Sequence, residues 1–407
     1  MRALNSVRAF IAAPMTVVGL SCGGDPGDPG NNNQNPKGVP VLTRTVVLDQ
    51  LSGPWDIAFA PDGAMFFTEK CRGLSVRQTS GTVVHLFGTS GAALAAPDLV
   101  CLGQSGVHGV ALDPTFSTSR VIYVYMTSNL STSPRTNRVV RLTLNAGYTS
   151  ASGRTDIVTN IALKDQANAV GGAGSHSGGR IRFGPDGHLY ITTGDNHNAI
   201  LPQSPTLLGG KVLRVTTTGA AAPGNAPPAG FDPRIFTYGH RNVQGIAFRP
   251  GTSQIFTSEH GPNHSDEVTL LANGGNGGWD PQNRPSLNCP DGYCGYAGTP
   301  TSMPMTDLTR FPNAMPAIWN NNAQSQGTGP TTFLDGPQWQ DWNGRLAVGV
   351  MGDSRLVILE LSASGSVLSQ VDATLTAARY RALTQGPDGN LYIATDQGEI
   401  WRVTPSP

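Results

Sequence analysis

A short turn motif recurs along this chain and constrains its fold more than any other feature of the sequence. Pro-Asp-Gly occurs at residues 61–63, 185–187 and 387–389, each time just before a short stretch of alternating polarity. Asp-Gly and Asn-Gly accommodate the positive φ angles of tight hairpins, so each copy predicts a β-hairpin. Weaker copies precede stretches that we predict as strands, over residues 121–126, 254–259 and 345–350.

Six such hairpins at intervals of about 45 to 90 residues fit six four-stranded blades, so we predict an all-β fold, a six-bladed β-propeller. A β-sandwich is the alternative, but the repeated Asp-Gly turns favour the propeller. The uneven spacing predicts long loops between strands. Loops held by a rigid scaffold are the usual place for a functional site.

The N-terminal 22 residues have the pattern of an export signal. Arg2 and Arg8 flank its start, and residues 9–20 are almost wholly apolar but too few to span a bilayer. The stretch ends in Leu-Ser-Cys-Gly, which resembles a bacterial lipoprotein signal with Cys22 as the lipidated residue. An ordinary secretory peptide is the alternative.

We therefore expect a signal peptide over residues 1–22, a flexible linker over 23–40 and the six-bladed propeller over 41–407. Residues 23–38 hold Gly, Asp, Pro and Asn but no large apolar side chain, which is typical of a linker. The chain would be exported, either as a periplasmic or outer-membrane lipoprotein tethered through Cys22 or as a secreted protein.

The cysteines and the net charge indicate further what kind of protein this is. Apart from Cys22 the chain has four cysteines, which in an exported protein predicts two disulfides. Cys289 and Cys294 lie in one Pro-Asp-Gly turn and are expected to pair, which leaves Cys71 for Cys101. The 27 basic and 27 acidic residues cancel, so we expect no nucleic acid partner.

Five segments place polar residues beside glycines near predicted strand ends. A histidine such as His176, with Asp195 one hairpin away, is a plausible general base with an orienting partner. Arginines from distant segments are suited to an anion with several carboxylates. The structural alternative is that these residues satisfy one another around the channel of a propeller. The segments are residues 103–109, 175–180 with 194–195, 238–245, 259–267 and 379–381.

At these segments the chain resembles the pyrroloquinoline quinone (PQQ)-dependent sugar dehydrogenases, which include soluble glucose dehydrogenase and the aldose sugar dehydrogenases. The resemblance runs from about Gly53 to Val403. The motifs that carry it are Gly103-Gln104-x-Gly-x-x-Gly109, His176-x-Gly-Gly-Arg180 with Gly194-Asp195, Tyr238-Gly-His-Arg-Asn242, Glu259-His-Gly-Pro262 and Arg379-Tyr-Arg381.

The resemblance implies PQQ over the channel with a calcium ion beside it. It implies that His176 takes the proton of the anomeric hydroxyl while hydride passes to the quinone, which yields a lactone. It further implies that Asp195 orients the base, that Gln104 lies near the sugar hydroxyl in the cofactor site, and that Arg241 and Asn242 bind the quinone oxygens. Also implied are Arg379 and Arg381 at the cofactor carboxylates, and Gly261 and Pro262 as carbonyl ligands of the calcium.

The sequence departs from the family pattern at several positions. Gly352 stands where the family commonly has a lysine that contacts PQQ, and Ser175 replaces the aspartate of glucose-oxidising members. The tyrosine of an Asn-Tyr-Gly-Trp stretch is absent from residues 276–279. Two assignments stay open. Asp266 and Glu267 bind a second, structural calcium or form a solvated acidic loop, and Trp319 stacks on a sugar or belongs to the core.

Three functions follow as hypotheses. The leading one is oxidation of an aldose to its lactone, with electrons passed to an external acceptor. The second, favoured by Gly352, is an inactive propeller that binds carbohydrate or protein at the channel mouth. The third, a calcium-dependent lactone hydrolase, needs several carboxylates converging on the channel. No dinucleotide-binding or haem-attachment motif is present in the sequence.

Overall fold

The computed structural model describes residues 38–132, 134–321 and 324–406. The chain divides into two units, residues 1–35 and 36–407, and the description below concerns the second. The predicted signal peptide, Cys22 and nearly all of the predicted linker lie outside the described residues.

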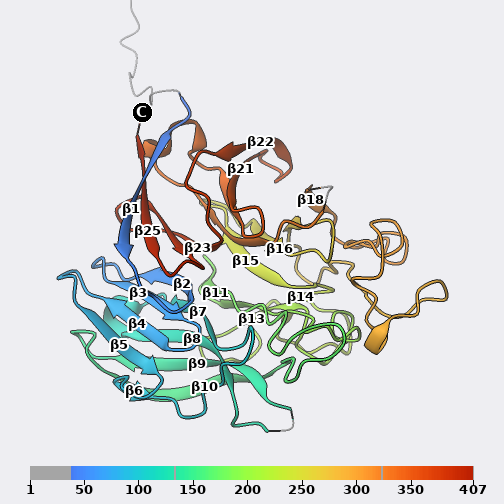
Figure 1. The fold of residues 1–407 in the computed structure, drawn as a ribbon, viewed down its shortest axis with the longest axis horizontal. Helices are drawn as coiled ribbons and strands as arrows, with labels where there is room; N and C mark the ends of the chain where they lie inside the picture. Colours follow the sequence, from blue (N-terminus) through green and yellow to red (C-terminus); the bar gives the residue numbers. More distant parts are fainter. Residues whose placement is uncertain (1–37, 133, 322–323, 407) are drawn as a thin grey trace, which may run out of the picture. The chain divides into compact units, whose positions relative to one another are not determined.

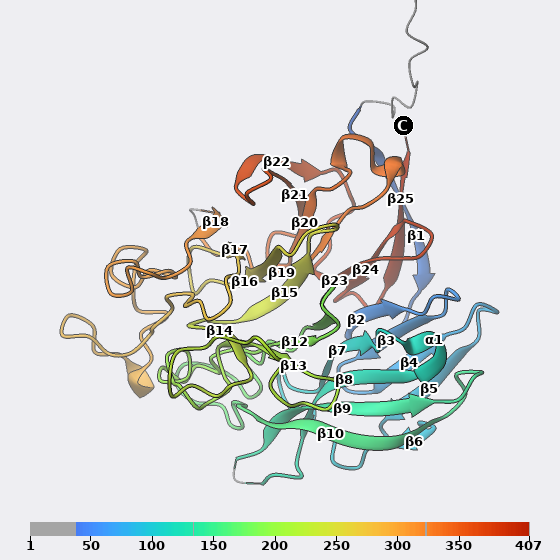
Figure 2. The same cartoon turned by 180° about the vertical axis from the view of Figure 1, so that it is seen from behind.

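The described residues form six antiparallel blades arranged as a β-propeller, as the turn pattern predicts (Figures 1 and 2). Blade 1 holds β2 (Pro54–Phe59), β3 (Met65–Glu69), β4 (Gly73–Arg77) and β5 (Val83–Gly88), with the short β6 (Leu94–Ala95) parallel to β5. Blade 2 holds β7 (Val107–Leu112), β8 (Val121–Ser128), β9 (Thr136–Leu144) and β10 (Ala151–Ile161). Blade 3 holds β11 (Ile181–Phe183), β12 (Leu189–Thr192), β13 (Lys211–Val215) and β14 (Ile235–Tyr238).

The remaining blades follow the same order along the chain, except for the last one. Blade 4 holds β15 (Val243–Phe248), β16 (Ile255–Glu259), β17 (Glu267–Leu270) and β18 (Ala317–Asn320). Blade 5 holds β19 (Thr328–Phe333), β20 (Leu346–Val350), β21 (Arg355–Leu361) and β22 (Val367–Ala373). Blade 6 holds β23 (Tyr380–Gln385), β24 (Leu391–Thr395), β25 (Ile400–Ser406) and, as its outer strand, β1 (Val41–Leu48). Helical turns are α1 (Phe116–Ser119) and the 3-10 segments Pro290–Gly292 and Pro337–Trp342.

The ring closes through the two ends of the propeller. Strand β1 pairs antiparallel with β25, with Val41 opposite Ser406. The first strands of the blades contact their neighbours around the ring, as β2 contacts β7 and β23. Full closure protects the strand edges that an open sheet would expose.

The turn residues explain why the hairpins form where the sequence predicts them. Gly63, Gly187 and Gly389 have φ angles of +90°, +75° and +75°, which side chains other than glycine rarely adopt. In the first copy, the Ala60 amide donates to the Ala64 carbonyl and closes the turn between β2 and β3.

One buried arginine ties the blades together beside the channel. The Arg180 guanidinium, 2% exposed, pairs with Asp56 and donates to the carbonyls of Trp55 (3.3 Å), Gln244 (3.1 Å) and Arg381 (2.8 Å). These partners lie in blades 1, 4 and 6. Arg180, part of the motif that carries the resemblance, therefore holds the scaffold.

Both disulfide predictions are confirmed, since Cys71 bonds to Cys101 and Cys289 to Cys294. Trp319 is buried in the core of blades 4 and 5, and its indole N–H donates to Gln370 Oε1 (2.7 Å). The alternative that Trp319 stacks on a sugar is therefore wrong, because its ring is covered by core side chains.

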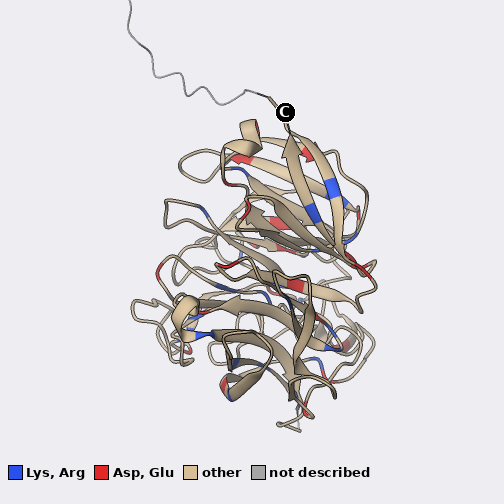
Figure 3. Ribbon diagram, turned by 90° about the vertical axis from the view of Figure 1, so that its left-hand side faces the viewer, with Lys and Arg blue, Asp and Glu red and all other residues tan. Residues whose placement is uncertain are grey.

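Charged residues are sparse and of mixed sign along the ribbon (Figure 3). In the part of the chain that the structure describes, no helix has the length and apolar character needed to cross a membrane.

Candidate active site

A cavity of about 580 Å³ receives side chains from all six blades. Small-molecule sites commonly have this size. Its wall combines predicted site residues from several blades with neighbours that the sequence did not single out: Trp55, Lys70, Gln104, His108, His176, Asn242, Gln244, His260, Tyr296, Met351, Arg379, Arg381 and Asp396.

His176 is held in an unusual backbone conformation at this cavity. Its φ is +52°, which is uncommon for a residue other than glycine and often marks a functional site. A side chain at position 194 would collide with the His176 carbonyl, so Gly194 permits the close approach of the two segments. His176 Nδ1 donates to Asp195 Oδ1 over 2.7 Å, which is the predicted base and its partner.

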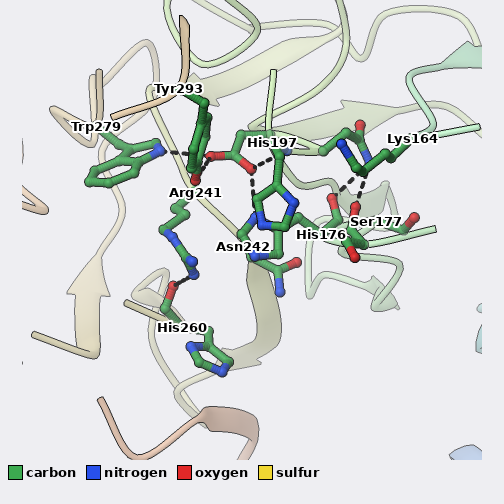
Figure 4. A network of polar contacts seen from close by, with 12 residues as sticks. Lys164, His176, Ser177, His197, Arg241, Asn242, His260, Trp279 and Tyr293 are labelled. Carbon is green, nitrogen blue, oxygen red and sulfur yellow. Dashed lines mark hydrogen bonds and ion pairs between the residues drawn. The ribbon is translucent and has the colours of Figure 1, made fainter. Parts of the chain in front are cut away.

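Three further donors hold the fully buried Asp195 carboxylate. The His197 amide reaches Oδ1 (3.0 Å), while the Trp279 indole (2.8 Å) and the Tyr293 hydroxyl (2.9 Å) reach Oδ2. Figure 4 shows Trp279 and Tyr293 on one side of this network and His197 on the other. Burial raises the pKa of Asp195, whereas Arg241, His197 and the Trp279 indole act against that shift. The carboxylate can therefore fix the Nδ1–H tautomer of His176.

Burial lowers the pKa of His176 well below its usual 6.5, and the charges of Arg241 and His260 act in the same direction. The imidazole is therefore neutral near pH 7. Because Nδ1 carries the proton given to Asp195, Nε2 presents a lone pair. This is the protonation state that a general base needs.

One phenol oxygen lies between His176 and Arg241. The Tyr296 hydroxyl is 3.3 Å from His176 Nε2, 2.9 Å from His197 Nε2 and 2.8 Å from Arg241 Nη2, which donates to it. Arg241 is 1% exposed and also donates to the His260 carbonyl over 2.7 Å (Figure 4). The base and the guanidinium thus converge on a single oxygen position.

The other predicted cofactor residues also border the cavity. Arg379 and Arg381 share Asp396, at 2.9 Å from Arg379 Nε and 2.7 Å from Arg381 Nη2. Asn242 accepts the Gly178 amide (3.1 Å), and Gln104 lines the wall on blade 2. Among the described wall residues, Asp396 is the single one with a carboxylate, and it is already paired with Arg379 and Arg381. This arrangement does not supply the several carboxylates that the hydrolase hypothesis needs.

The predicted calcium residues lie beside the cavity wall. The Gly261 carbonyl accepts from the ring of His260, which lines the cavity, and the Gly261 amide donates to Asp266 Oδ1 (2.7 Å). Pro262 is buried next to it. The calcium assignment of Gly261 and Pro262 stays a prediction.

Asp266 and Glu267 are 0% and 5% exposed, so the alternative of a solvated acidic loop is wrong. Asp266 accepts from the Ser325 hydroxyl and the Gln326 amide (both 2.7 Å), while Glu267 accepts from the Thr306 hydroxyl (2.9 Å). Among the described residues, no group of three or more His, Cys, Asp or Glu side chains is arranged to hold a metal ion. A second calcium here stays a prediction.

The structure explains the departure at Gly352, while the other two departures have no structural explanation. A side chain at position 352 would collide with the Gln326 carbonyl, so the backbone there requires glycine. Ser175 is buried at 3% exposure. The stretch 276–279, which has no tyrosine, contributes Trp279, whose indole N–H donates to Asp195.

Two tyrosines of the site come from the long loop between β17 and β18. The Cys289–Cys294 disulfide lies in this loop, which brings Tyr293 to Asp195 and Tyr296 to His176. Sequence reasoning missed both tyrosines, Trp279 and His197. His197 lies two residues after Asp195 and was within reach of a motif argument, but no local pattern marks the tyrosines.

The sequence profile described as "Glucose / Sorbosone dehydrogenase" matches residues 51–402, which is most of the chain. The chain belongs to this family. The aldose sugar dehydrogenase YliI of Escherichia coli K12 is 28% identical over 377 residues, which cover 90% of this chain and 94% of that protein. The quinoprotein glucose dehydrogenase B of Acinetobacter calcoaceticus is 31% identical over 265 residues, 58% of this chain and 52% of that protein.

Solved structures agree with this assignment. A putative oxidoreductase (glucose dehydrogenase) of Thermus thermophilus has a TM-score of 0.69 and 29% identity, and the match covers 89% of this chain and 99% of that one. Membership of the glucose/sorbosone dehydrogenase family, together with these relatives, supports an oxidoreductase of the sugar dehydrogenase class.

Proposed function

We propose that this protein is a PQQ-dependent dehydrogenase that oxidises an aldose at its anomeric carbon to the lactone, with His176 as the base. The observation that carries the proposal is the convergence of His176 Nε2 and Arg241 on one oxygen position, which the Tyr296 hydroxyl fills. An enzyme that removes a hydroxyl proton needs a lone pair at that distance. The quinoprotein relative from Acinetobacter supports the choice of cofactor.

The cavity residues fit an anionic quinone and a hard cation. Arg379 and Arg381 line the cavity and would present guanidinium groups to the carboxylates of the quinone. The wall residue Asn242, and Arg241, which donates to the wall residue Tyr296, would donate to the quinone oxygens. The carbonyls of Gly261 and Pro262 would supply the hard oxygen ligands that calcium prefers, and the Gly261 carbonyl accepts a hydrogen bond from the His260 ring, which lines the cavity. Bound PQQ would supply the electrophilic carbon that accepts hydride.

The chain itself supplies positioning and proton transfer. The sugar hydroxyl would take the place of the Tyr296 oxygen and lose its proton to His176 Nε2. The imidazolium that forms would be stabilised by the Asp195 carboxylate through the 2.7 Å contact at Nδ1. The remaining donors on Asp195 keep the carboxylate aligned, so the pair needs little rearrangement during the reaction.

We also propose that the protein works outside the cytoplasm, tethered through Cys22 or secreted, and passes electrons to an external acceptor. The signal-like N-terminus supports export. Radiolabelled palmitate incorporation that is lost in Cys22→Ala would support the tether, whereas equal labelling of both proteins would contradict it.

Tyr296→Phe should lower KM for the sugar by about 3- to 10-fold and change kcat little. The phenol oxygen competes with the substrate hydroxyl for His176 Nε2 and Arg241, and one net hydrogen bond contributes about 0.5–1.5 kcal/mol. Steady-state kinetics of the PQQ-loaded enzyme measure both constants. A higher KM would mean that Tyr296 helps to hold the sugar rather than competing with it.

Reconstitution tests the proposed function as a whole. Purified protein is mixed with PQQ and calcium, then offered a panel of aldoses with an artificial electron acceptor. We expect a shift in PQQ absorbance on mixing and sugar-dependent dye reduction. A protein that leaves the PQQ spectrum unchanged would overturn the proposal and favour a propeller that only binds carbohydrate or protein.

A further inference from the structure

Blade 1 contributes a lysine side chain, held by two hydrogen bonds of its residue, to the rim of the cavity. Lys70 directly follows β3 and lines the cavity wall. Its ammonium donates to the Gly103 carbonyl (2.7 Å), and its own carbonyl accepts the Val107 amide (2.8 Å). Two contacts therefore fix Lys70 against the loop that carries Gln104.

The neighbouring disulfide reinforces this position. Cys71, the next residue, bonds to Cys101, two residues before Gly103. This cross-link holds the end of β3 and the Gln104 loop at a constant separation, because Cys71 adjoins Lys70 and Cys101 lies close to Gly103, the two residues that are hydrogen-bonded. The Lys70 side chain thus reaches the cavity from a rigid rim.

Gly106 leaves the space that the Lys70 side chain uses. Its φ is +142°, and a Cβ there would lie 2.8 Å from Lys70 Cγ and would collide with the Lys70 carbonyl. Glycine at this position therefore permits the lysine stem to cross the loop.

The charge of Lys70 is not compensated by a carboxylate. In residues 38–132, 134–321 and 324–406, no ion pair involves Lys70, and Arg72 is the residue that pairs with the adjacent Glu69 (3.8 Å). By contrast, Arg379 and Arg381 share Asp396. Because an ammonium carries three N–H groups and the Gly103 carbonyl accepts one, two remain for a ligand.

The position on blade 5 cannot carry a cation. Residue 352 has no room for a Cβ next to the Gln326 carbonyl, so a lysine there would require the backbone to move. The cavity wall instead obtains a cationic side chain, in addition to Arg379 and Arg381, from blade 1 at the end of β3.

We propose that Lys70 binds a carboxylate of the anionic quinone and replaces the cationic contact that Gly352 lacks. This inference rests on the proposed function, since the ligand is its cofactor. Recognition is by charge and hydrogen bonding from a partly exposed ammonium, so Lys70 acts as a binding residue and not in proton transfer.

Titration of apo-protein with PQQ, followed by absorbance in the presence of calcium, tests Lys70 without any turnover. We expect Lys70→Gln to raise the Kd for PQQ about 10-fold, as for one charged hydrogen bond in a partly exposed site. Lys70→Arg should retain most of the affinity. Arg72→Gln is the matched control. It also removes one positive charge, two residues further along the chain, but the Arg72 side chain is not part of the described cavity wall.

The outcomes separate this inference from the proposed function. If the wild type binds PQQ and Lys70→Gln binds it equally well, the role of Lys70 is overturned and the proposed function stands. If the wild type itself does not bind PQQ, both are overturned. Thermal unfolding and an intact Cys71–Cys101 bond, checked by mass spectrometry, show whether Lys70→Gln is folded. Should it be misfolded, Lys70→Met is titrated in its place. A Kd for PQQ raised about 10-fold in that variant supports the role of Lys70, and an unchanged Kd overturns it.

Discussion

His176→Ala is expected to lower kcat of the PQQ-loaded enzyme by roughly a thousandfold, within the range that a positioned general base contributes. The imidazole is the group whose free nitrogen lies at the oxygen position shared with Arg241, and its other nitrogen is fixed by Asp195. Steady-state dye reduction with a saturating aldose measures the loss. PQQ affinity and thermal stability should change little, because the side chain is small and borders a cavity.

A matched control is His85→Ala, which removes an imidazole on β5 that is not part of the described cavity wall. We expect its kcat to equal that of the wild type. If His176→Ala keeps its kcat within threefold of the wild type while folded and loaded, His176 is not the base.

The same side chain sets the acid limb of the pH profile. Burial holds the pKa of His176 below its usual 6.5, so the imidazole stays unprotonated at pH values where a free histidine is half charged. A base works only when unprotonated, and kcat/KM should therefore stay constant as the pH falls through 6.5 and decline only at lower pH. A decline centred on pH 6.5 would show that burial does not govern this group.

The local chemistry of turns is what made the fold predictable. Asp62-Gly63, Asp186-Gly187 and Asp388-Gly389 dictate hairpins through their own φ angles, and the six repeats then leave few ways to bury the strands. The pairing of His176 with Asp195 was also accessible, because a single hairpin separates them. Short-range constraints of this kind can be read from one sequence.

The parts that sequence reasoning missed depend on long-range packing. Tyr293 and Tyr296 reach the site from the loop between two strands of blade 4. Tyr293 lies 98 residues after Asp195, and Tyr296 lies 120 residues after His176. The structural role of Arg180 likewise depends on contacts with blades 1, 4 and 6, whose residues lie far apart in the sequence. Nothing in the local pattern distinguishes an arginine at a cavity from one that crosses the scaffold.

The network around Asp195 makes this residue a positioning group of unusual precision. His176, His197, Trp279 and Tyr293 all direct donors at its two oxygens. Such a carboxylate has no freedom to rotate away from His176 Nδ1. Its effect on the reaction is therefore expected to come through the imidazole tautomer, and that effect is separable from its effect on folding.

Asp195→Asn should lower kcat by roughly a hundredfold or more, with little change in the Kd for PQQ. In the variant the amide N–H₂ can donate to His176 Nδ1, which places the imidazole proton on Nε2 and removes the lone pair that faces the cavity. Tyr293→Phe is the matched control, because it keeps the carboxylate and removes one of its four donors, and we expect a loss of less than about 10-fold. Nitrogen-15 chemical shifts of the His176 ring report the tautomer directly. A folded Asp195→Asn enzyme with its proton still on Nδ1 and near-normal turnover would show that the carboxylate does not act through the base.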